Sequence, residues 1–242
     1  MPARTGFDTL SAMSITLTLI SSMATKALLA DLVAGFQHAH PGITVQVESV
    51  GGVDAAKRVQ AGEAFDVVAL AADAIERLAA GGHVVADTRV DMVRSEVAVA
   101  VPADADRPDI STEEALKAAV LAAPTLGYST GPSGVALAQL FERWGIAEQV
   151  APRIVTPPPG VPVGSLVAKG EVALGFQQRS ELMNVPGIAL LGGMPEAVQI
   201  VTTFSAARAT LSTQAEAVDA FLRHLVSPAT AAIKQRHGMT PA

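Results

Sequence analysis

The chain has 242 residues, of which 50% are hydrophobic, and its formal net charge is -6. This length allows one large or two modest domains, and the acidic balance, with no basic run longer than Lys57-Arg58, excludes the basic surface that nucleic acid or an acidic membrane would bind. The absence of cysteine excludes thiol catalysis, disulfides and thiolate metal sites, and it is compatible with any redox compartment.

The N-terminal residues 1–13 predict a disordered leader. The first 23 residues lack the unbroken apolar region and small-residue cleavage site of an export signal, so the chain as written is expected to be cytoplasmic. No window approaches the roughly 18 to 20 continuous apolar residues of a membrane span, so no membrane insertion is expected.

From residue 14 onward, short apolar or β-branched runs alternate with helical patterns. In the first half the expected strands are 15–20, 43–50, 65–71 and 95–103, and the expected helices are 24–40, 53–62 and 73–82. Strands that alternate with helices predict parallel sheets covered on both faces.

The second half repeats this pattern. Its expected strands are 125–129, 153–156, 172–178 and 197–207, its expected helices are 112–123, 134–146 and 162–171, and one or two helices close the chain over 215–238. The proline-rich segment 156–162 predicts a stiff, extended loop. The chain therefore reads as two α/β units of similar size.

One stretch, LGYSTGPSGVALAQLFERWGI at 126–146, predicts an anion cradle. Small and hydroxyl-bearing residues, Ser129 to Gly134, lead directly into an amphipathic helix. The first N–H groups of a helix lack intrahelical partners and sit at its positive end, where they bind anions. The alternative is a plain loop and helix cap, because Ser and Thr are favoured there for backbone reasons alone.

Four segments, in order and over nearly the whole chain, resemble periplasmic solute-binding proteins of the molybdate-binding type. They are ISSMATKALLADLVAGFQHAHPGITV, GGVDAAKRVQAGEAFDVVALAAD, KGEVALGFQQ and SPATAAIKQRHGMTPA. The resemblance implies two α/β lobes joined by two crossing strands, 95–101 and 199–206, with a ligand cleft between the lobes. Lobe one would then comprise 14–96 and 201–242, and lobe two would comprise 97–200.

The chain departs from that family at two expected ligand positions. The second loop, Gly51-Gly52-Val53-Asp54, has no hydroxyl, and the late strand ends in Gln177-Gln178 where the family places a Tyr. A carboxylate at Asp54 would repel a tetrahedral dianion if it faced the site. We therefore expect an organic di- or tricarboxylate in place of molybdate, with its apolar body against Met23 or Val53.

The family's geometry directs two loop-to-helix junctions at the cleft from opposite lobes. Gly51 and Gly52 could simply permit a tight turn, and strand alternation allows only one of the two glutamines to face the cleft. The expected ligand-binding residues are Ser21, Ser22, Met23, Gly51, Gly52, Val53, Ser129, Thr130, Ser133, Gly134, Gly160, Val161 and Gln177.

Three functions remain open from sequence. The leading hypothesis is a monomeric binding protein for a small anion, with no cofactor or metal; if it is exported, an ABC transporter permease would be its membrane partner. The alternative is an isomerase acting on an unsaturated tricarboxylate, because aconitate isomerase resembles the same family; Asp54 is then the candidate base. The third is an intracellular sensor. The five histidines lack the paired spacing of a metal site.

Overall fold

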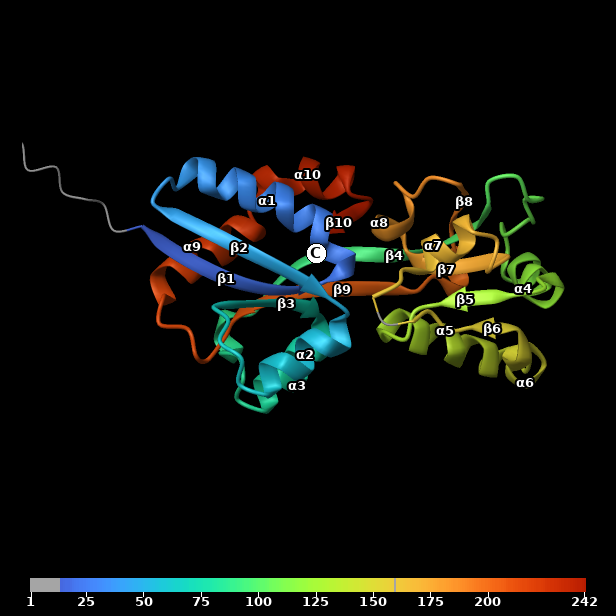
Figure 1. The fold of residues 1–242 in the computed structure, drawn as a ribbon, viewed down its shortest axis with the longest axis horizontal. Helices are drawn as coiled ribbons and strands as arrows, with labels where there is room; N and C mark the ends of the chain where they lie inside the picture. Colours follow the sequence, from blue (N-terminus) through green and yellow to red (C-terminus); the bar gives the residue numbers. More distant parts are fainter. Residues whose placement is uncertain (1–13, 159) are drawn as a thin grey trace, which may run out of the picture.

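The computed structural model describes residues 14–158 and 160–242. The predicted disordered leader, 1–13, lies outside the described residues. Figure 1 shows two α/β units side by side, joined by long strands that run between them.

Lobe one is built on three parallel strands, β1 (Ile15–Ser22), β2 (Ile43–Val50) and β3 (Val67–Ala71), in the order β2-β1-β3. The connections are the short 3-10 helix η1 (Met23–Thr25) with α1 (Lys26–Ala39), then α2 (Gly52–Gln60). The remaining elements of the lobe are α3 (Ala72–Ala80), η2 (Ala86–Thr88), α9 (Ala215–Leu225), η5 (Pro228–Thr230), α10 (Ala231–Arg236) and β10 (Met239–Pro241). Helices cover both faces of the sheet, so β3 is buried along its whole length.

Two antiparallel strands, β4 (Val90–Pro102) and β9 (Val201–Arg208), connect the lobes. The first part of β4, up to Glu96, pairs with β9, and the part from Val97 onward pairs with β7 and β8. Because β4 changes partners between these two residues, we propose the lobe limits expected above, 14–96 with 201–242 and 97–200.

Lobe two surrounds the second half of β4. Its strands are β5 (Leu126–Tyr128), β6 (Ile154–Val155), β7 (Leu174–Gln178) and β8 (Ile188–Gly193). Its helices are α4 (Glu113–Ala122), α5 (Pro132–Arg143), α6 (Ala147–Val150), η3 (Ala151–Arg153), α7 (Val163–Ala168), α8 (Arg179–Leu182) and η4 (Glu196–Val198). The strand order β4-β7-β5-β6 continues the sheet of lobe one.

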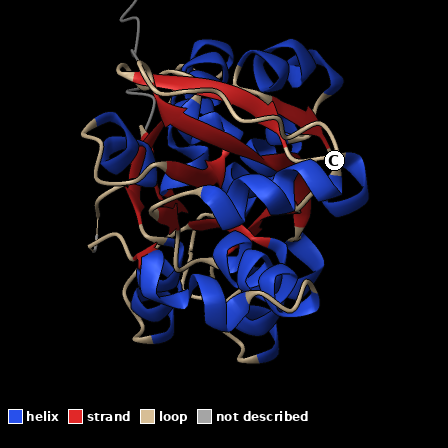
Figure 2. Ribbon diagram, turned by 90° about the vertical axis from the view of Figure 1, so that its right-hand side faces the viewer, coloured by secondary structure: helices blue, strands red, loops and turns tan. Residues whose placement is uncertain are grey.

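Each lobe has a buried apolar cluster on each face of its sheet. In lobe one, Phe36 and Phe221 are fully buried in the cluster beside α1 and α9, while Ile75 lies in the cluster on the opposite face. In lobe two, Phe141 and Phe176 pack between α5 and the sheet, and Val163 lies in the cluster under α7. Figure 2 shows this layering, with strands between helices.

Each expected strand and helix overlaps an observed element, and the alternation of the two is confirmed. Among the α-helices and β-strands, sequence patterns missed α6, α8, β8 and β10, of which α6, α8 and β10 have four residues or fewer. Short elements have little periodicity of their own, and β8 and β10 both form by pairing with β4, a strand distant in sequence.

Candidate ligand-binding site between the lobes

The carboxyl ends of β1 and β2 in lobe one, those of β5 and β7 in lobe two, and the turns that follow them lie near the crossing strands. We call this set the interlobe junction. Two hydrogen bonds tie it together: the Ser180 hydroxyl donates to the carbonyl of Ala24 at 3.0 Å, and the Gln178 amide donates to the Thr202 hydroxyl at 2.9 Å. The first of these bonds joins α8 of lobe two to η1 of lobe one.

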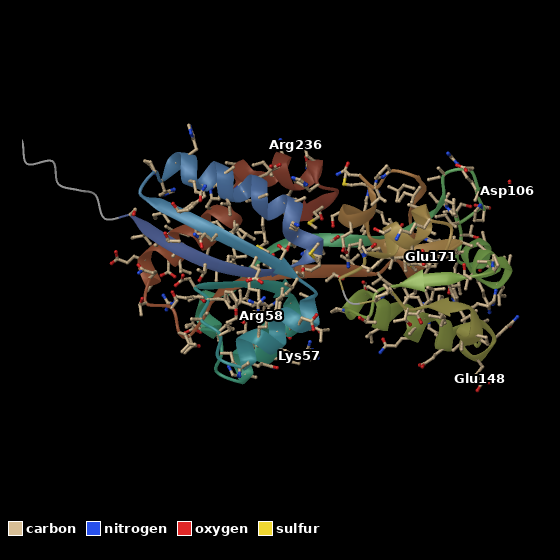
Figure 3. All side chains as sticks on the ribbon, viewed as in Figure 1. Lys57, Arg58, Asp106, Glu148, Glu171 and Arg236 are labelled. Atoms are coloured by element: carbon tan, nitrogen blue, oxygen red, sulfur yellow. The ribbon has the colours of Figure 1, made fainter. Side chains whose placement is uncertain are left out.

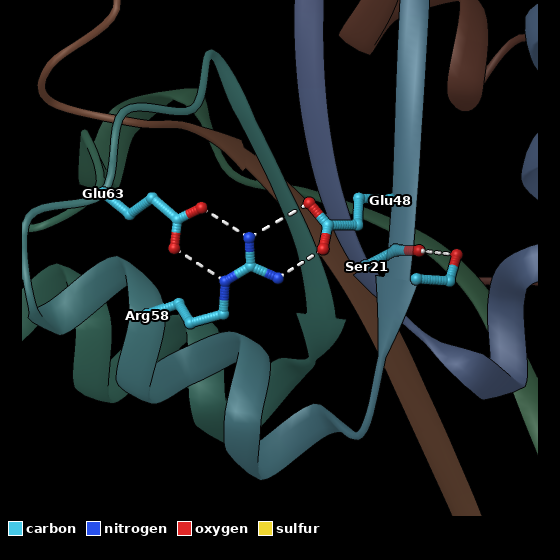
Figure 4. Close-up of polar contacts among 5 residues, drawn as sticks. Ser21, Glu48, Arg58 and Glu63 are labelled. Atoms are coloured by element: carbon cyan, nitrogen blue, oxygen red, sulfur yellow. Dashed lines mark hydrogen bonds and ion pairs between the residues drawn. The ribbon is translucent and has the colours of Figure 1, made fainter. Parts of the chain in front are cut away.

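The first loop of the junction presents two buried serines. Ser21 and Ser22 end β1, and the Ser21 hydroxyl lies 2.7 Å from that of Ser49 near the end of β2. A dashed line at Ser21 in Figure 4 marks this contact. The Ser22 hydroxyl is buried without a hydrogen-bond partner in the described part of the chain. Such a group costs free energy unless something binds it, so Ser22 is a candidate ligand contact.

The second loop lies against the first. A Cβ built on Gly52 would lie 3.6 Å from Cβ of Ser22. Gly51 is the N-cap of α2, and no side chain caps that helix. Asp54 is exposed in the first turn, and its carboxylate lies close to Gly51, beside the N-terminus of its own helix. An uncapped helix N-terminus leaves N–H groups available to an anion.

The predicted cradle in lobe two is the N-terminus of α5. Its N-cap, Gly131, has no side-chain cap, and Ser133 is buried with its hydroxyl 3.4 Å from that of Ser129. Thr130 is exposed. Gly134 is required by space, because a Cβ there would lie 1.6 Å from the carbonyl oxygen of Ser129. The loop therefore folds tightly over the first turn of α5.

The two glutamines at the end of β7 have different partners, as strand alternation predicts. The side-chain oxygen of Gln177 accepts the Gly164 N–H of α7 at 3.0 Å, and its side-chain NH2 group donates to the Glu181 carboxylate at 2.8 Å. The side-chain oxygen of Gln178 is buried without a hydrogen-bond partner among the described residues. The expected ligand contact through Gln177 stays a prediction, while Gln178 carries the free acceptor.

The remaining expected contacts lie before α7. Gly160 has a φ of +77°, a conformation that favours glycine, and the Val161 N–H donates to the carbonyl of Pro158. Their loop leads to the N-cap Pro162, which forms no side-chain cap. Gly160 and Val161 therefore stay predicted contacts at the start of this helix.

Exposed apolar side chains lie on elements that begin beside the junction. The described residues include six exposed large hydrophobic side chains, and four of them, between 38% and 54% exposed, lie on these elements. Met23, Val53 and Val135 lie in the first turns of η1, α2 and α5, and Val201 begins the crossing strand β9. Only Met23 and Val53 were expected from sequence. We call these four residues the apolar collar.

The charged residues labelled in Figures 3 and 4 include some that form ion pairs and some that lie far from the junction. Arg58 on α2 forms ion pairs with Glu48 and Glu63, which Figure 4 shows on either side of its guanidinium. Figure 3 places Asp106 and Glu148 at the outer end of lobe two. In residues 14–158 and 160–242, no cluster of three or more His, Asp or Glu side chains is arranged to hold a metal ion.

Glu181, on α8, is a candidate functional residue that the sequence did not indicate. Burial raises the pKa of its carboxyl to about 7, and the hydrogen bond from Gln177 opposes part of that effect. Its local sequence, QQRSEL, is ordinary for the start of a helix, so only tertiary burial distinguishes it. A carboxyl group with a pKa near neutrality can both accept and donate a proton.

Two α/β lobes, two crossing strands and uncapped helix N-termini at their junction define a two-lobed protein for small ligands. The model of the bacterial extracellular solute-binding protein family matches residues 17–240, and the chain belongs to this family. Within the described residues no helix has the length and hydropathy to cross a membrane.

Similar proteins include an enzyme and several binding proteins. Aconitate isomerase from a Pseudomonas species is 35% identical over 234 residues, which cover 93% of this chain and 88% of that protein. The structure of the periplasmic molybdate-binding protein of Azotobacter vinelandii has a TM-score of 0.76 at 18% identity, covering 93% of this chain and 99% of the other. The sulfate-binding protein of Mycobacterium tuberculosis has a TM-score of 0.75 at 15% identity, covering 94% and 87%. The two structures confirm the fold.

Proposed function

We propose that this protein binds an unsaturated tricarboxylate at the interlobe junction and isomerises it by moving a proton between carbons. The aconitate isomerase relative supports this isomerase hypothesis better than binding without chemistry. Among the structural features, the apolar collar beside two uncapped helix N-termini supports it most.

The chemistry of the junction suits an organic anion. The N–H groups at the starts of α2 and α5 stabilise carboxylates, and the free oxygens of Ser22 and Gln178 can form hydrogen bonds with a ligand. A bare oxyanion has no apolar surface to place against Met23, Val53, Val135 and Val201, whereas a carbon-bodied acid does.

The same arrangement favours proton abstraction next to a carboxylate. Removal of such a proton places negative charge on the carboxylate oxygens, and helix N–H groups that bind those oxygens stabilise the charge as it develops. Asp54 was the base expected from sequence; it is exposed beside its own helix N-terminus and remains a candidate.

The experiment is incubation of purified protein with cis- and trans-configured unsaturated tricarboxylates in D2O, followed by NMR over time. Isomerisation, with solvent deuterium entering the ligand, is the expected result. The control is the same incubation with heat-denatured protein. A tricarboxylate that binds, raises the melting temperature and stays chemically unchanged would contradict the enzymatic function and support the binding-only alternative.

Molybdate, tungstate and sulfate form the comparison set of the same study. We expect each of them to shift the melting temperature less than the tricarboxylate does. An oxyanion that gives the larger shift would contradict the interpretation of the apolar collar.

A further inference from the structure

The α8 helix lies where the two lobes touch. Its Ser180 hydroxyl donates to the Ala24 carbonyl of η1, and its other neighbour in lobe one is the C-terminal segment before β10. A Cβ built on Gly238 would lie 3.1 Å from the sulfur of Met183 and 3.4 Å from Cγ of Arg179. Glu181, one residue after Ser180, is therefore carried on an element that both lobes contact.

Glu181 is connected to the end of β7 and to the start of α7. Its carboxylate accepts the Gln177 amide, and the carbonyl of Gln177 accepts the Gly164 N–H. None of the ion pairs formed by the described residues includes Glu181. This carboxyl group is thus partly buried and neutralised by no cation.

We propose that Glu181 is the residue that moves the proton in the isomerisation, an inference that rests on the proposed function. The α8 helix begins directly after Gln178, whose free carbonyl oxygen lies at the junction. Gln177 donates to one carboxylate oxygen of Glu181, and in this proposal the other oxygen takes the proton from a ligand held at the junction.

The step balances without any further reactant. The carboxylate takes a proton from a methylene carbon next to a ligand carboxylate, and the electrons of that C–H bond form a new double bond to the neighbouring carbon. The original double bond shifts its electrons toward its far carbon, so the charge spreads over the allylic system and the adjoining carboxylates. The proton then returns from Glu181 to the far carbon, or to the same carbon after rotation, and the ligand leaves as its isomer.

The surroundings suit that exchange. The pKa of Glu181 is raised to about 7 mainly by burial, so the group is ionised enough to accept a proton and acidic enough to return it. Glu48 and Glu63 differ, because each pairs with Arg58 and has its pKa lowered by that pairing.

The test compares Glu181→Gln with a matched control, Glu171→Gln. The amide at position 181 keeps the size of the side chain and can still accept the Gln177 hydrogen bond, so binding affinity should change by no more than about threefold. Loss of a general acid-base group should lower isomerisation and solvent deuterium exchange by about 100-fold or more. Glu171 is an exposed carboxylate of the same lobe, labelled in Figure 3, and its substitution should leave both readouts unchanged.

A second measurement holds even if the variant folds poorly. The kcat/KM of the wild-type protein should rise with pH up to about pH 7 and stay constant above it, because the base must be ionised in the free protein. Turnover by Glu181→Gln close to the wild-type rate, or a flat profile between pH 5.5 and 8.5, would overturn the role of Glu181. Absence of turnover in the wild type would instead overturn the proposed function, which separates the two failures.

Discussion

The loop before α5 can lie against the first turn of that helix only because Gly134 has no side chain. We predict that Gly134→Ala destabilises the protein by about 2 to 3 kcal/mol or more, because the new Cβ would overlap the carbonyl oxygen of Ser129 and the loop must move. Ligand affinity should fall in parallel, since the same loop carries Ser129. Chemical denaturation and a binding isotherm measure the two effects.

The control is Gly131→Ala in the same loop. A Cβ at that position would lie 3.7 Å from its nearest neighbour, the Ser129 hydroxyl, which is ordinary contact, and Gly131 has a φ of -78°, which any residue adopts. The stability of this variant should stay within about 1 kcal/mol of the wild type. Equal destabilisation by both variants would contradict a specific steric role for Gly134.

Glu181 also gives a pH dependence of stability. Its folded pKa of about 7 lies above the ordinary value of 4.5, so the native state holds the proton more tightly than the unfolded chain does. Its contribution to stability is complete below pH 4.5, decreases as the pH rises through 7, and is lost above that. We predict that the unfolding free energy of Glu181→Gln minus that of the wild type is larger at pH 8 than at pH 5. The increase should be on the order of 2 kcal/mol.

Urea denaturation of both proteins at the two pH values measures this difference. Glu171→Gln again serves as the control, because Glu171 is exposed and takes part in none of the ion pairs of the described residues. A stability difference between Glu181→Gln and wild type that is the same at pH 5 and pH 8 would show that Glu181 titrates as it would in water.

At the scale of elements, helix starts differ in how they are capped. The Thr112 side chain caps α4 by accepting the Ala115 N–H, whereas α2, α5 and α7 have no side-chain cap. Other helices, among them α3 and α9, also lack a side-chain cap, but α2, α5 and α7 follow β2, β5 and β6, so their N-termini lie at the junction. Hydroxyl groups near these starts, those of Ser22 and Ser133, are therefore available for a ligand.

We predict that the double variant Ser22→Ala/Ser133→Ala weakens carboxylate binding by about 100-fold or more, since each of the two lost hydrogen bonds to a charged group is worth about 1.5 kcal/mol or more. Its melting temperature should change little, because the Ser22 hydroxyl has no protein partner in the described structure and the Ser133 hydroxyl has only a long contact to Ser129. Calorimetric titration and thermal melting provide the two values.

Thr112→Ala is the opposite control. It removes a true cap far from the junction, so it should cost about 1 kcal/mol of stability and leave ligand affinity unchanged. If the double serine variant loses stability and keeps its affinity, these hydroxyls are structural.

At the scale of the whole molecule, β4 makes one continuous strand through both lobes. A ligand bound between the lobes adds contacts to each of them, and closure of this kind is the usual response of two-lobed binding proteins. The bond between Ser180 and Ala24 shows that the lobes already touch at one side of the junction.

We predict one melting transition that a tricarboxylate moves as a whole. A ligand at 100 times its Kd stabilises the folded state by about 2.7 kcal/mol, which corresponds to a rise of about 5 to 10 °C for a chain of this size. Differential scanning calorimetry with and without ligand tests it. Two transitions, of which the ligand shifts only one, would show that a single lobe holds the ligand.

The sequence by itself determined the alternation of strands and helices, the two-lobed class, and the loops that lead into α1, α2 and α5. These features depend on local periodicity, on Gly and Ser at helix starts, and on segments whose order is preserved along the chain. Met23 and Val53 could be identified in this way because they lie within such loops.

Only the tertiary structure decided the rest. The joining of Val135 and Val201 to the apolar collar, the free oxygen of Gln178 and the burial of Glu181 all depend on neighbours far away in the chain. Desolvation and hydrogen-bond satisfaction are properties of the space around a group, and that space is made by segments that no local pattern relates to one another.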